Sequence, residues 1–251
     1  MNFREGLQRG RGRADARRGS RIATRAAIVA AGGRGERAGR SSELPKQFHQ
    51  LAGRPMIHWS LDALLDAGCS PLIVVLPHDL DQDPVPFLAS YDDVVITTGG
   101  DTRQASIASG LEEVTADVVV VHDAARPLID GAMVREVTAA VEKSDGAVLA
   151  VPVDETLKLV EAARVSATID RAGLWRSQTP QAFRTETLRR CHESAFSDGF
   201  SATDDAALLE HYGYSVAVVE GRRSNIKVTW PEDLDLAEAY LSRRGAGEGS
   251  R

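Results

Sequence analysis

Short apolar runs, separated by segments with a helical pattern, give the first picture of this chain. The runs contain mainly Ala, Val, Ile and Leu and span 26–31, 72–76, 94–97, 118–122 and 147–151. Uninterrupted runs of this length are typical of strands that are buried on both faces, as in a parallel sheet. Each run is therefore predicted to be a strand.

Helical patterns fill the segments between these runs. The segment 55–68 begins with proline, ends with glycine and carries Leu65 on an apolar face, while Asp130 and either Thr102 or Asp101 can serve as N-caps. The alternation predicts an α/β fold with an open, mostly parallel, Rossmann-like sheet and helices on both faces. The predicted helices after the first one span 102–111, 130–143, 185–195, 204–211 and 231–243.

The pattern changes after the fifth predicted strand. Residues 154–174 are short, polar and strand-like, with candidate strands at 156–160 and 168–170. They contain too few apolar positions for a core, so we expect a protruding β-arm that meets a partner subunit, as in a homodimer. A late strand at 215–219 and an extended piece at 225–227 complete the predicted elements.

The distribution of charge divides the chain unevenly. Residues 1–25 hold eight arginines against two acids, whereas the whole chain of 251 residues has a net charge of −6. We expect a disordered basic extension over 1–24, a single domain over 25–243 and a flexible tail over 244–251. The acidic body argues against nucleic acid as a partner, and no apolar run is long enough to cross a membrane.

Cysteine usage points to a reducing compartment. Cys69 and Cys191 lie far apart and form no metal-ligand pattern with the six histidines. We expect buried free thiols in a cytoplasmic protein.

The stretch 26–46 carries the strongest chemical signal, because a buried strand runs into a glycine-rich loop with several cations. Gly33 to Ala38 matches the dinucleotide fingerprint G-x-G-x-x-A. However, Pro45 interrupts a following helix, and the acid expected about twenty residues on is missing. No P-loop motif is present. The remaining interpretations are a polyphosphate cradle flanked by Arg37 and Lys46, or a plain tight turn with solvated cations.

Two further strands end in residues that suit a nucleotide. After the strand at 94–97, Asp101 and Ser106 offer an acceptor and a donor for a base edge, although this stretch also suits an ordinary helix cap. After the strand at 118–122, Asp123 is well placed for a ribose or a metal. Ligands of open α/β sheets bind beyond the carboxyl ends of the strands, so the coincidence favours one shared site. Lys227 alternates with apolar residues and can point into the same cleft.

The motifs taken together resemble those of the 2-C-methyl-D-erythritol 4-phosphate cytidylyltransferase family, which has a nucleotidyltransferase-type fold. The resemblance covers roughly residues 25–243. It rests on Ala30-Ala31-Gly32 through Arg37, Pro45-Lys46-Gln47-Phe48, Gly99-Gly100-Asp101 with Arg103, His122-Asp123-Ala124-Ala125-Arg126-Pro127, Thr179-Pro180-Gln181 with Phe183, Asn225-Ile226-Lys227-Val228-Thr229, and Pro231-Glu232-Asp233-Leu234.

The resemblance implies transfer of CMP from CTP to a polyol phosphate, with Mg²⁺ held mainly by the CTP phosphates and with Asp123 as the candidate metal ligand of the protein. Arg37 and Lys46 would bind the triphosphate and stabilise the transition state, and Asp123 would lie where ribose, metal and acceptor meet. The residues implied to hold the nucleotide are Ala30, Ala31 and Gly32, and those implied to read cytosine are Gly100, Asp101 and Ser106.

The resemblance also implies an acceptor site and a dimer. In the family the arm of one subunit reaches into the site of the other, so Thr156 and Arg171 would act in trans. The residues implied to bind methylerythritol phosphate are Arg126, Thr156, Arg171, Thr203 and Lys227.

The expected reaction needs charge stabilisation more than proton transfer. A phosphate oxygen of the acceptor is already an anion when it attacks the α-phosphorus of CTP, so no general base is required. Three alternatives remain open at this point: another acceptor such as ribitol 5-phosphate, an NAD(P)-binding oxidoreductase, and a nucleotide sensor without activity.

Overall fold

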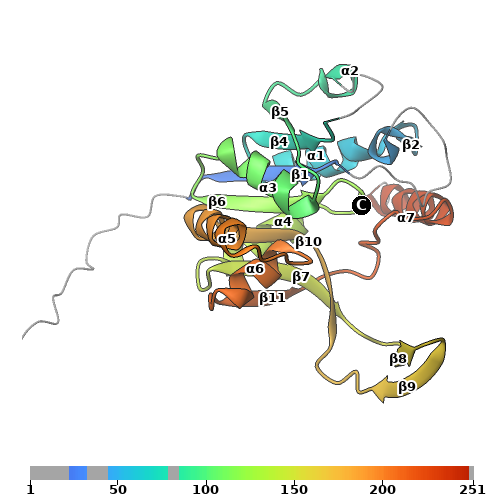
Figure 1. Cartoon of the computed structure of the whole chain (residues 1–251). Helices are drawn as coiled ribbons and strands as arrows, with labels where there is room; N and C mark the ends of the chain where they lie inside the picture. The colour runs from blue at the N-terminus through green and yellow to red at the C-terminus, as the bar shows by residue number, and fades with distance from the viewer. Residues whose placement is uncertain (1–22, 33–44, 79–84, 249–251) are drawn as a thin grey trace, which may run out of the picture.

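One central sheet organises the fold, and the order of its strands differs from their order along the chain. The computed structural model describes residues 23–32, 45–78 and 85–248. These residues form a seven-stranded sheet in the order β11-β7-β10-β6-β1-β4-β5, with helices on both sides (Figure 1). The strands span Arg25–Ala30 (β1), Leu72–Leu76 (β4), Val94–Thr98 (β5), Val118–Asp123 (β6), Gly146–Pro152 (β7), Trp175–Arg184 (β10) and Val216–Glu220 (β11).

The predicted parallel sheet is confirmed, and its strand ends are within two residues of the prediction. β1 pairs in parallel with β6 on one side and with β4 on the other. The strands β4 and β6 are buried along their whole length, which explains why their apolar runs have no polar interruption. The register places Ala30 opposite Asp123. The chain that follows β1 and the end of β6 therefore meet at one edge of the sheet.

The sequence pattern does not predict β10, which lies between β6 and β7 and runs antiparallel to both. The strand reads WRSQTPQAFR, so its buried half contains Gln178, Thr179 and Gln181 in place of an apolar run. Burial of these polar side chains is tolerated because each has a hydrogen-bond partner inside the protein. The pairing register shifts between Ser177 and Gln181.

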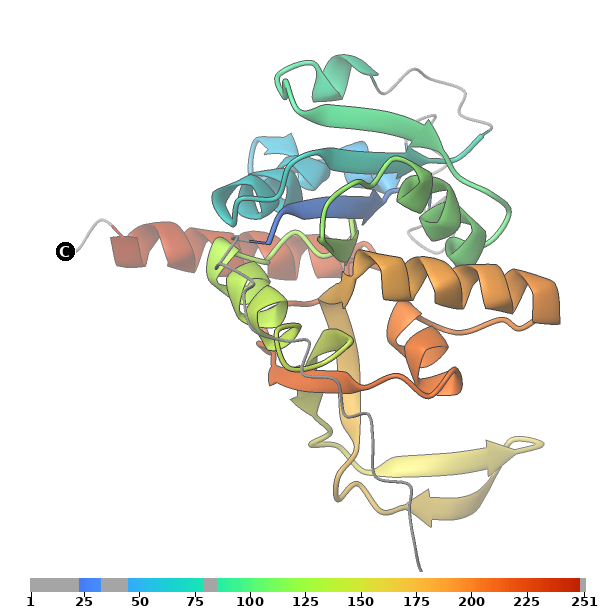
Figure 2. The same ribbon diagram turned by 90° about the vertical axis from the view of Figure 1, so that its left-hand side faces the viewer.

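Helices cover both faces of the sheet, as Figure 2 shows. Ile57 of α1 and Met133 of α4 belong to the apolar core on one face. Ile107 of α3 and Leu188 of α5 belong to the core on the other, together with Leu208 of α6. The helices span Met56–Asp66 (α1), Val85–Leu88 (α2), Arg103–Glu112 (α3), Gly131–Ala140 (α4), Thr185–Asp198 (α5), Asp205–His211 (α6) and Glu232–Glu248 (α7).

Small elements attach the last helix to the body. A 3-10 turn, η2 (Lys46–Phe48), precedes the short strands β2 (Gln50–Leu51) and β3 (Arg54–Pro55). Ala237 of α7 packs with Leu51 of β2 in a third apolar cluster. α7 continues beyond the predicted end at Arg243 to Glu248, inside the segment 244–251 for which a flexible tail was predicted.

Several predicted details are wrong. α4 ends at Ala140 and is followed by turns, so Lys143 is not helical. Leu65 is 36% exposed, because it lies at the rim of the face that α1 buries. α2, at Val85–Leu88, is not among the predicted elements.

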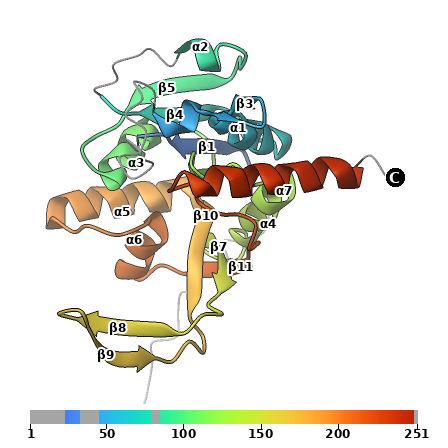
Figure 3. The same ribbon diagram turned by 90° about the vertical axis from the view of Figure 1, so that its right-hand side faces the viewer.

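A two-stranded hairpin extends away from the body in all three views and is clearest in Figure 3. It consists of β8 (Leu157–Glu161) and β9 (Arg164–Ile169), paired antiparallel. Its side chains are largely exposed, and Leu159, Val160 and Val165 are among the exposed large apolar residues. The hairpin lies within the segment predicted to be an arm.

Candidate nucleotide pocket

A pocket of about 290 Å³ lies at the carboxyl ends of β1 and β6. Segments distant in sequence line it, among them the end of β1, the η2 turn, the beginning of α3 and the stretch around Lys227. Most of the nucleotide-side residues singled out in the sequence are therefore brought together. The lining includes Ala30, Gly32, Lys46, Gly100, Asp101, Ser106, Asp123 and Lys227.

The η2 turn fixes Lys46 at the pocket. Pro45 precedes the turn, and the buried Gln47 donates its side-chain N–H to the carbonyl of Ala31, just beyond β1. Lys46 Nζ donates to the carbonyl oxygen of Val228 over 2.7 Å. This contact keeps the ammonium group near the segment that carries Lys227.

The turn before α3 is held close to the backbone by two glycines. A Cβ on Gly99 would lie 2.5 Å from Ser106 Oγ, and one on Gly100 would lie 2.7 Å from the Cβ of Ala105. Thr102 caps α3 by accepting from the N–H of Ala105 over 3.0 Å, which decides between the two predicted caps. Asp101 is therefore exposed at the pocket instead of serving as the cap.

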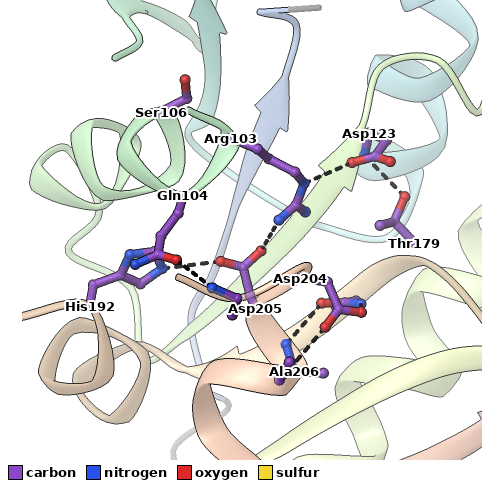
Figure 4. Close-up of polar contacts among 12 residues, drawn as sticks. Arg103, Gln104, Ser106, Asp123, Thr179, His192, Asp204, Asp205 and Ala206 are labelled. Atoms are coloured by element: carbon purple, nitrogen blue, oxygen red, sulfur yellow. Dashed lines mark hydrogen bonds and ion pairs between the residues drawn. The ribbon is translucent and has the colours of Figure 1, made fainter. Parts of the chain in front are cut away.

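Asp123 is the most strongly paired carboxylate of the pocket. Its Oδ2 lies 2.7 Å from Lys227 Nζ, and its Oδ1 lies 3.4 Å from Arg103 Nε (Figure 4 shows the Arg103 side). Burial alone would raise the pKa of Asp123, but the charges of Lys227 and Arg103 outweigh it and hold the pKa well below its usual range. The group is therefore an anion at any pH near neutrality.

A buried polar chain supports Asp123 from behind. Thr179 Oγ1 accepts from the N–H of Asp123 over 3.0 Å and lies 3.1 Å from His122 Nδ1. Burial lowers the pKa of His122 to about 4, so its ring is neutral. His122 Nε2 lies 3.1 Å from Ser60 Oγ and 3.2 Å from the carbonyl of Arg126, which places the ring proton on Nε2. His122 thus orients backbone around Asp123 and does not line the pocket.

The predicted acceptor residues are only partly brought together. Lys227 lines the pocket, whereas Arg126 lies beside it and donates from Nη1 to the carbonyl of Asn225 over 2.8 Å. Thr203 is exposed in the connection between α5 and α6. Thr156 and Arg171 are exposed in the arm segment and do not line the pocket of their own chain.

Some predicted residues cannot be placed. Arg37 lies outside the described residues, as does most of the fingerprint at 33–38. Ala31 is buried behind the pocket and contributes its carbonyl to Gln47. The dinucleotide interpretation gains no support, because β4, the next strand of the sheet after β1, ends at Leu76.

Sequence reasoning missed Arg103 and Asp205, although Arg103 stood in a motif that was quoted. Arg103 lines the pocket and donates from Nη1 to Asp205 Oδ2 over 2.7 Å (Figure 4). Asp205 is 1% exposed. Its position in the first turn of the helix predicted at 204–211 concealed its role, because acids are common there in any helix.

The described residues hold neither a preformed metal cluster nor a membrane span. No group of three or more His, Cys, Asp or Glu side chains in that part of the chain could hold a metal ion by itself. No helix within 23–32, 45–78 and 85–248 is long and apolar enough to span a membrane. Cys69 and Cys191 are both buried free thiols, as expected.

Comparison with known proteins gives a consistent result. The family model for 2-C-methyl-D-erythritol 4-phosphate cytidylyltransferase matches residues 25–243. The protein of that name from Aquifex aeolicus is 45% identical over 216 residues, which cover 86% of this chain and 96% of the relative. The Acidobacterium capsulatum protein of that name is 40% identical over 233 residues, covering 87% and 98%. The crystal structure of the Thermus thermophilus cytidylyltransferase matches with a TM-score of 0.73 at 36% identity, covering 86% of this chain and 98% of that one.

Proposed function

The chain belongs to the 2-C-methyl-D-erythritol 4-phosphate cytidylyltransferase family, and we propose that its pocket transfers CMP from CTP to 2-C-methyl-D-erythritol 4-phosphate. The products are 4-diphosphocytidyl-2-C-methyl-D-erythritol and pyrophosphate, in isoprenoid precursor synthesis by the non-mevalonate pathway. One observation carries the proposal: a single pocket joins a glycine turn suited to a base with Lys46, Asp123 and Lys227.

We propose that the nucleotide lies along the carboxyl ends of the strands. Its cytosine would face Gly100, Asp101 and Ser106, where the glycine turn lets a flat ring approach the backbone. Its ribose and α-phosphate would lie near Ala30 and Asp123, with Gly32 at the floor of the pocket and Ala31 buried behind it.

Catalysis would depend on the placing of charge. The attacking phosphate oxygen of the acceptor forms a bond to the α-phosphorus of CTP, and the bond to the bridging oxygen of pyrophosphate breaks. Lys46, together with Arg37, would neutralise charge that builds up on the phosphates, and fixed cations do so without reorganisation. The buried His122 is neutral and outside the pocket, which suits a reaction without a general base.

Magnesium suits the donor set of this pocket. Mg²⁺ usually keeps several waters and binds one or two carboxylates together with substrate phosphates. Asp123 is an ionised carboxylate at the pocket, and no group of three or more His, Cys, Asp or Glu side chains among the described residues could hold an ion by itself. A bound ion would neutralise charge on the triphosphate. The chain itself would contribute Asp123 and, around it, the cations Lys46, Lys227 and Arg103.

The acceptor would be bound on the Lys227 side of the pocket. We propose that Lys227, Arg126 and Thr203 of one subunit bind its phosphate and hydroxyl groups. Thr156 and Arg171 would come from the arm of the partner subunit in a homodimer, since neither lines the pocket of its own chain. We place this enzyme in the cytoplasm, as its free thiols suggest.

A pyrophosphate-release assay tests the proposed function. The protein is incubated with CTP and Mg²⁺, and with methylerythritol phosphate, ribitol 5-phosphate or no acceptor. We expect pyrophosphate only with methylerythritol phosphate. Faster release with ribitol phosphate would assign another acceptor, and no release with either, combined with nicotinamide cofactor binding, would overturn the proposal.

Lys227→Ala tests the acceptor side of the pocket. We expect mainly a higher KM for methylerythritol phosphate, because the side chain is 46% exposed and lies 2.7 Å from Asp123 at the proposed acceptor position. Steady-state kinetics with each substrate varied in turn measures the effect. Lys143→Ala removes an exposed lysine beyond α4 and should leave both KM values unchanged. A rise confined to the KM for CTP would contradict the assignment.

Val165→Asp tests the dimer. Val165 is 61% exposed on β9, and a charge there should oppose burial against a partner arm. We expect the variant to sediment as a monomer and to lose most of its turnover, because Thr156 and Arg171 could no longer reach the partner's pocket. Phe196→Asp introduces the same charge at an exposed apolar position on α5 and should leave the dimer intact. A dimeric, active Val165→Asp variant would refute the role of the arm.

A further inference from the structure

Arg103 lies between two carboxylates from different parts of the fold (Figure 4). Its Nη1 donates to Asp205 Oδ2 over 2.7 Å, whereas its Nε lies 3.4 Å from Asp123 Oδ1. Charge-assisted hydrogen bonds are strong near 2.8 Å and weaken steeply with distance. Asp205 is therefore the stronger partner, and Arg103 is tethered on the side away from Asp123.

Asp205 is held in place by a second side chain. His192, on α5, lies with its Nε2 3.1 Å from Asp205 Oδ1, and both residues are buried. Burial alone would raise the pKa of Asp205, but the hydrogen bond from His192 and the charge of Arg103 lower it below its usual range. An ionised carboxylate only accepts hydrogen bonds, so Nε2 of His192 carries the proton.

The residue next to Arg103 fixes the same junction. Gln104 donates to the carbonyl of Phe200 over 3.1 Å and accepts from the N–H of Ala202 over 3.0 Å. The first turn of α3 is thus attached to the backbone of the connection between α5 and α6 through Gln104, and to the first residue of α6 through Arg103. That connection also carries Thr203, the proposed acceptor residue.

The two cationic side chains that pair with Asp123 differ in how far they can move. The side chain of Lys227 is 46% exposed, and its charge partner among the described residues is Asp123 alone, so it can turn toward an anionic substrate group. The side chain of Arg103 is 30% exposed and is tethered by a buried carboxylate. Arg103 therefore stays beside Asp123 when Lys227 moves.

We infer that Asp205 and His192 are positioning residues that hold Arg103, and through it Asp123, in the arrangement needed for nucleotidyl transfer. The inference rests on the role proposed for Asp123. Without Asp205, the guanidinium would be free to close on Asp123 or on the triphosphate, and the carboxylate would lose its fixed orientation. Supporting groups of this kind typically contribute about ten- to hundredfold to activity.

A double-mutant cycle on Arg103 and Asp205 tests the inference. We expect Asp205→Asn and Arg103→Gln each to lower kcat about ten- to hundredfold, with little change in the KM for CTP. The double variant should be no slower than the slower single variant, because each substitution already breaks the same ion pair between Arg103 and Asp205. The inference would be overturned if the fold-losses in kcat of the two single variants multiplied in the double variant, or if Asp205→Asn kept the kcat of the wild type.

Controls separate this inference from a fold effect and from the proposed function. Asp198→Asn makes the same substitution at an exposed position on α5 and should leave kcat unchanged. If Asp205→Asn does not fold, His192→Gln and His192→Met form a matched pair of similar shape, of which only Gln can donate to Asp205. His192→Gln should be the faster enzyme, and equal rates would overturn the inference. Absence of pyrophosphate release by the wild type would instead refute the proposed function.

Discussion

Replacing Lys46 by alanine should lower kcat about 10²–10³-fold, since this is the usual loss when one preorganised stabiliser of transition-state charge is removed. Lys46 lines the pocket and is held there by contacts within the protein. Pro45 precedes its turn, Gln47 ties that turn to the end of β1, and Lys46 Nζ already donates to Val228. A cation held in this way stabilises charge without a cost of reorganisation at the moment of reaction.

The measurement is turnover at saturating CTP and acceptor, with pyrophosphate as the product. Lys46→Arg is the matched variant, because it keeps the charge but changes its shape, and it should recover part of the lost rate. Thermal unfolding should differ little between the variants and the wild type. Turnover of Lys46→Ala close to that of the wild type would remove Lys46 from the catalytic residues.

Asp123→Asn is expected to lower turnover by about two orders of magnitude, an effect as large as that of removing a preorganised charged group. The substitution keeps the shape of the side chain but removes the anion between Lys227 and Arg103. Both cations would then face the pocket without their shared counter-charge, and the carboxylate proposed for ribose and metal would be absent. The dependence of turnover on Mg²⁺ concentration should also weaken.

The difference in the free energy of unfolding between the wild type and Asp123→Asn should depend on pH in a defined way. The pKa of Asp123 is depressed in the folded protein, so its contribution to the free energy of unfolding is present above the ordinary carboxyl pKa of about 4 and is lost as pH falls through the depressed value. The stability difference between wild type and Asp123→Asn should be constant from pH 7 to about pH 5 and shrink in more acidic solution. Asp101→Asn, at an exposed acid of the same pocket, is the control. A difference that grows on acidification would contradict the ion pairing.

Much of the fold could be predicted from the sequence because the relevant signals are local. The apolar runs at 72–76 and 118–122 are strands in the structure, and Asp130 caps the helix that it was expected to cap. Strand β10 could not be predicted in this way. Its buried positions carry Gln178, Thr179 and Gln181, whose burial depends on partners that only the folded chain supplies.

For the candidate site, too, some features could be predicted from the sequence and others could not. The sequence by itself determined which loops carry suitable chemistry, because parallel strands place their carboxyl ends at one edge and the motifs lie just beyond those ends. Only the tertiary structure decided the pairings. Lys227 meets Asp123 across 104 positions of sequence, and Arg103 meets Asp205 across 102. Such pairs depend on the distance between side chains in space, and neither the spacing nor the residue types of these segments encode that distance.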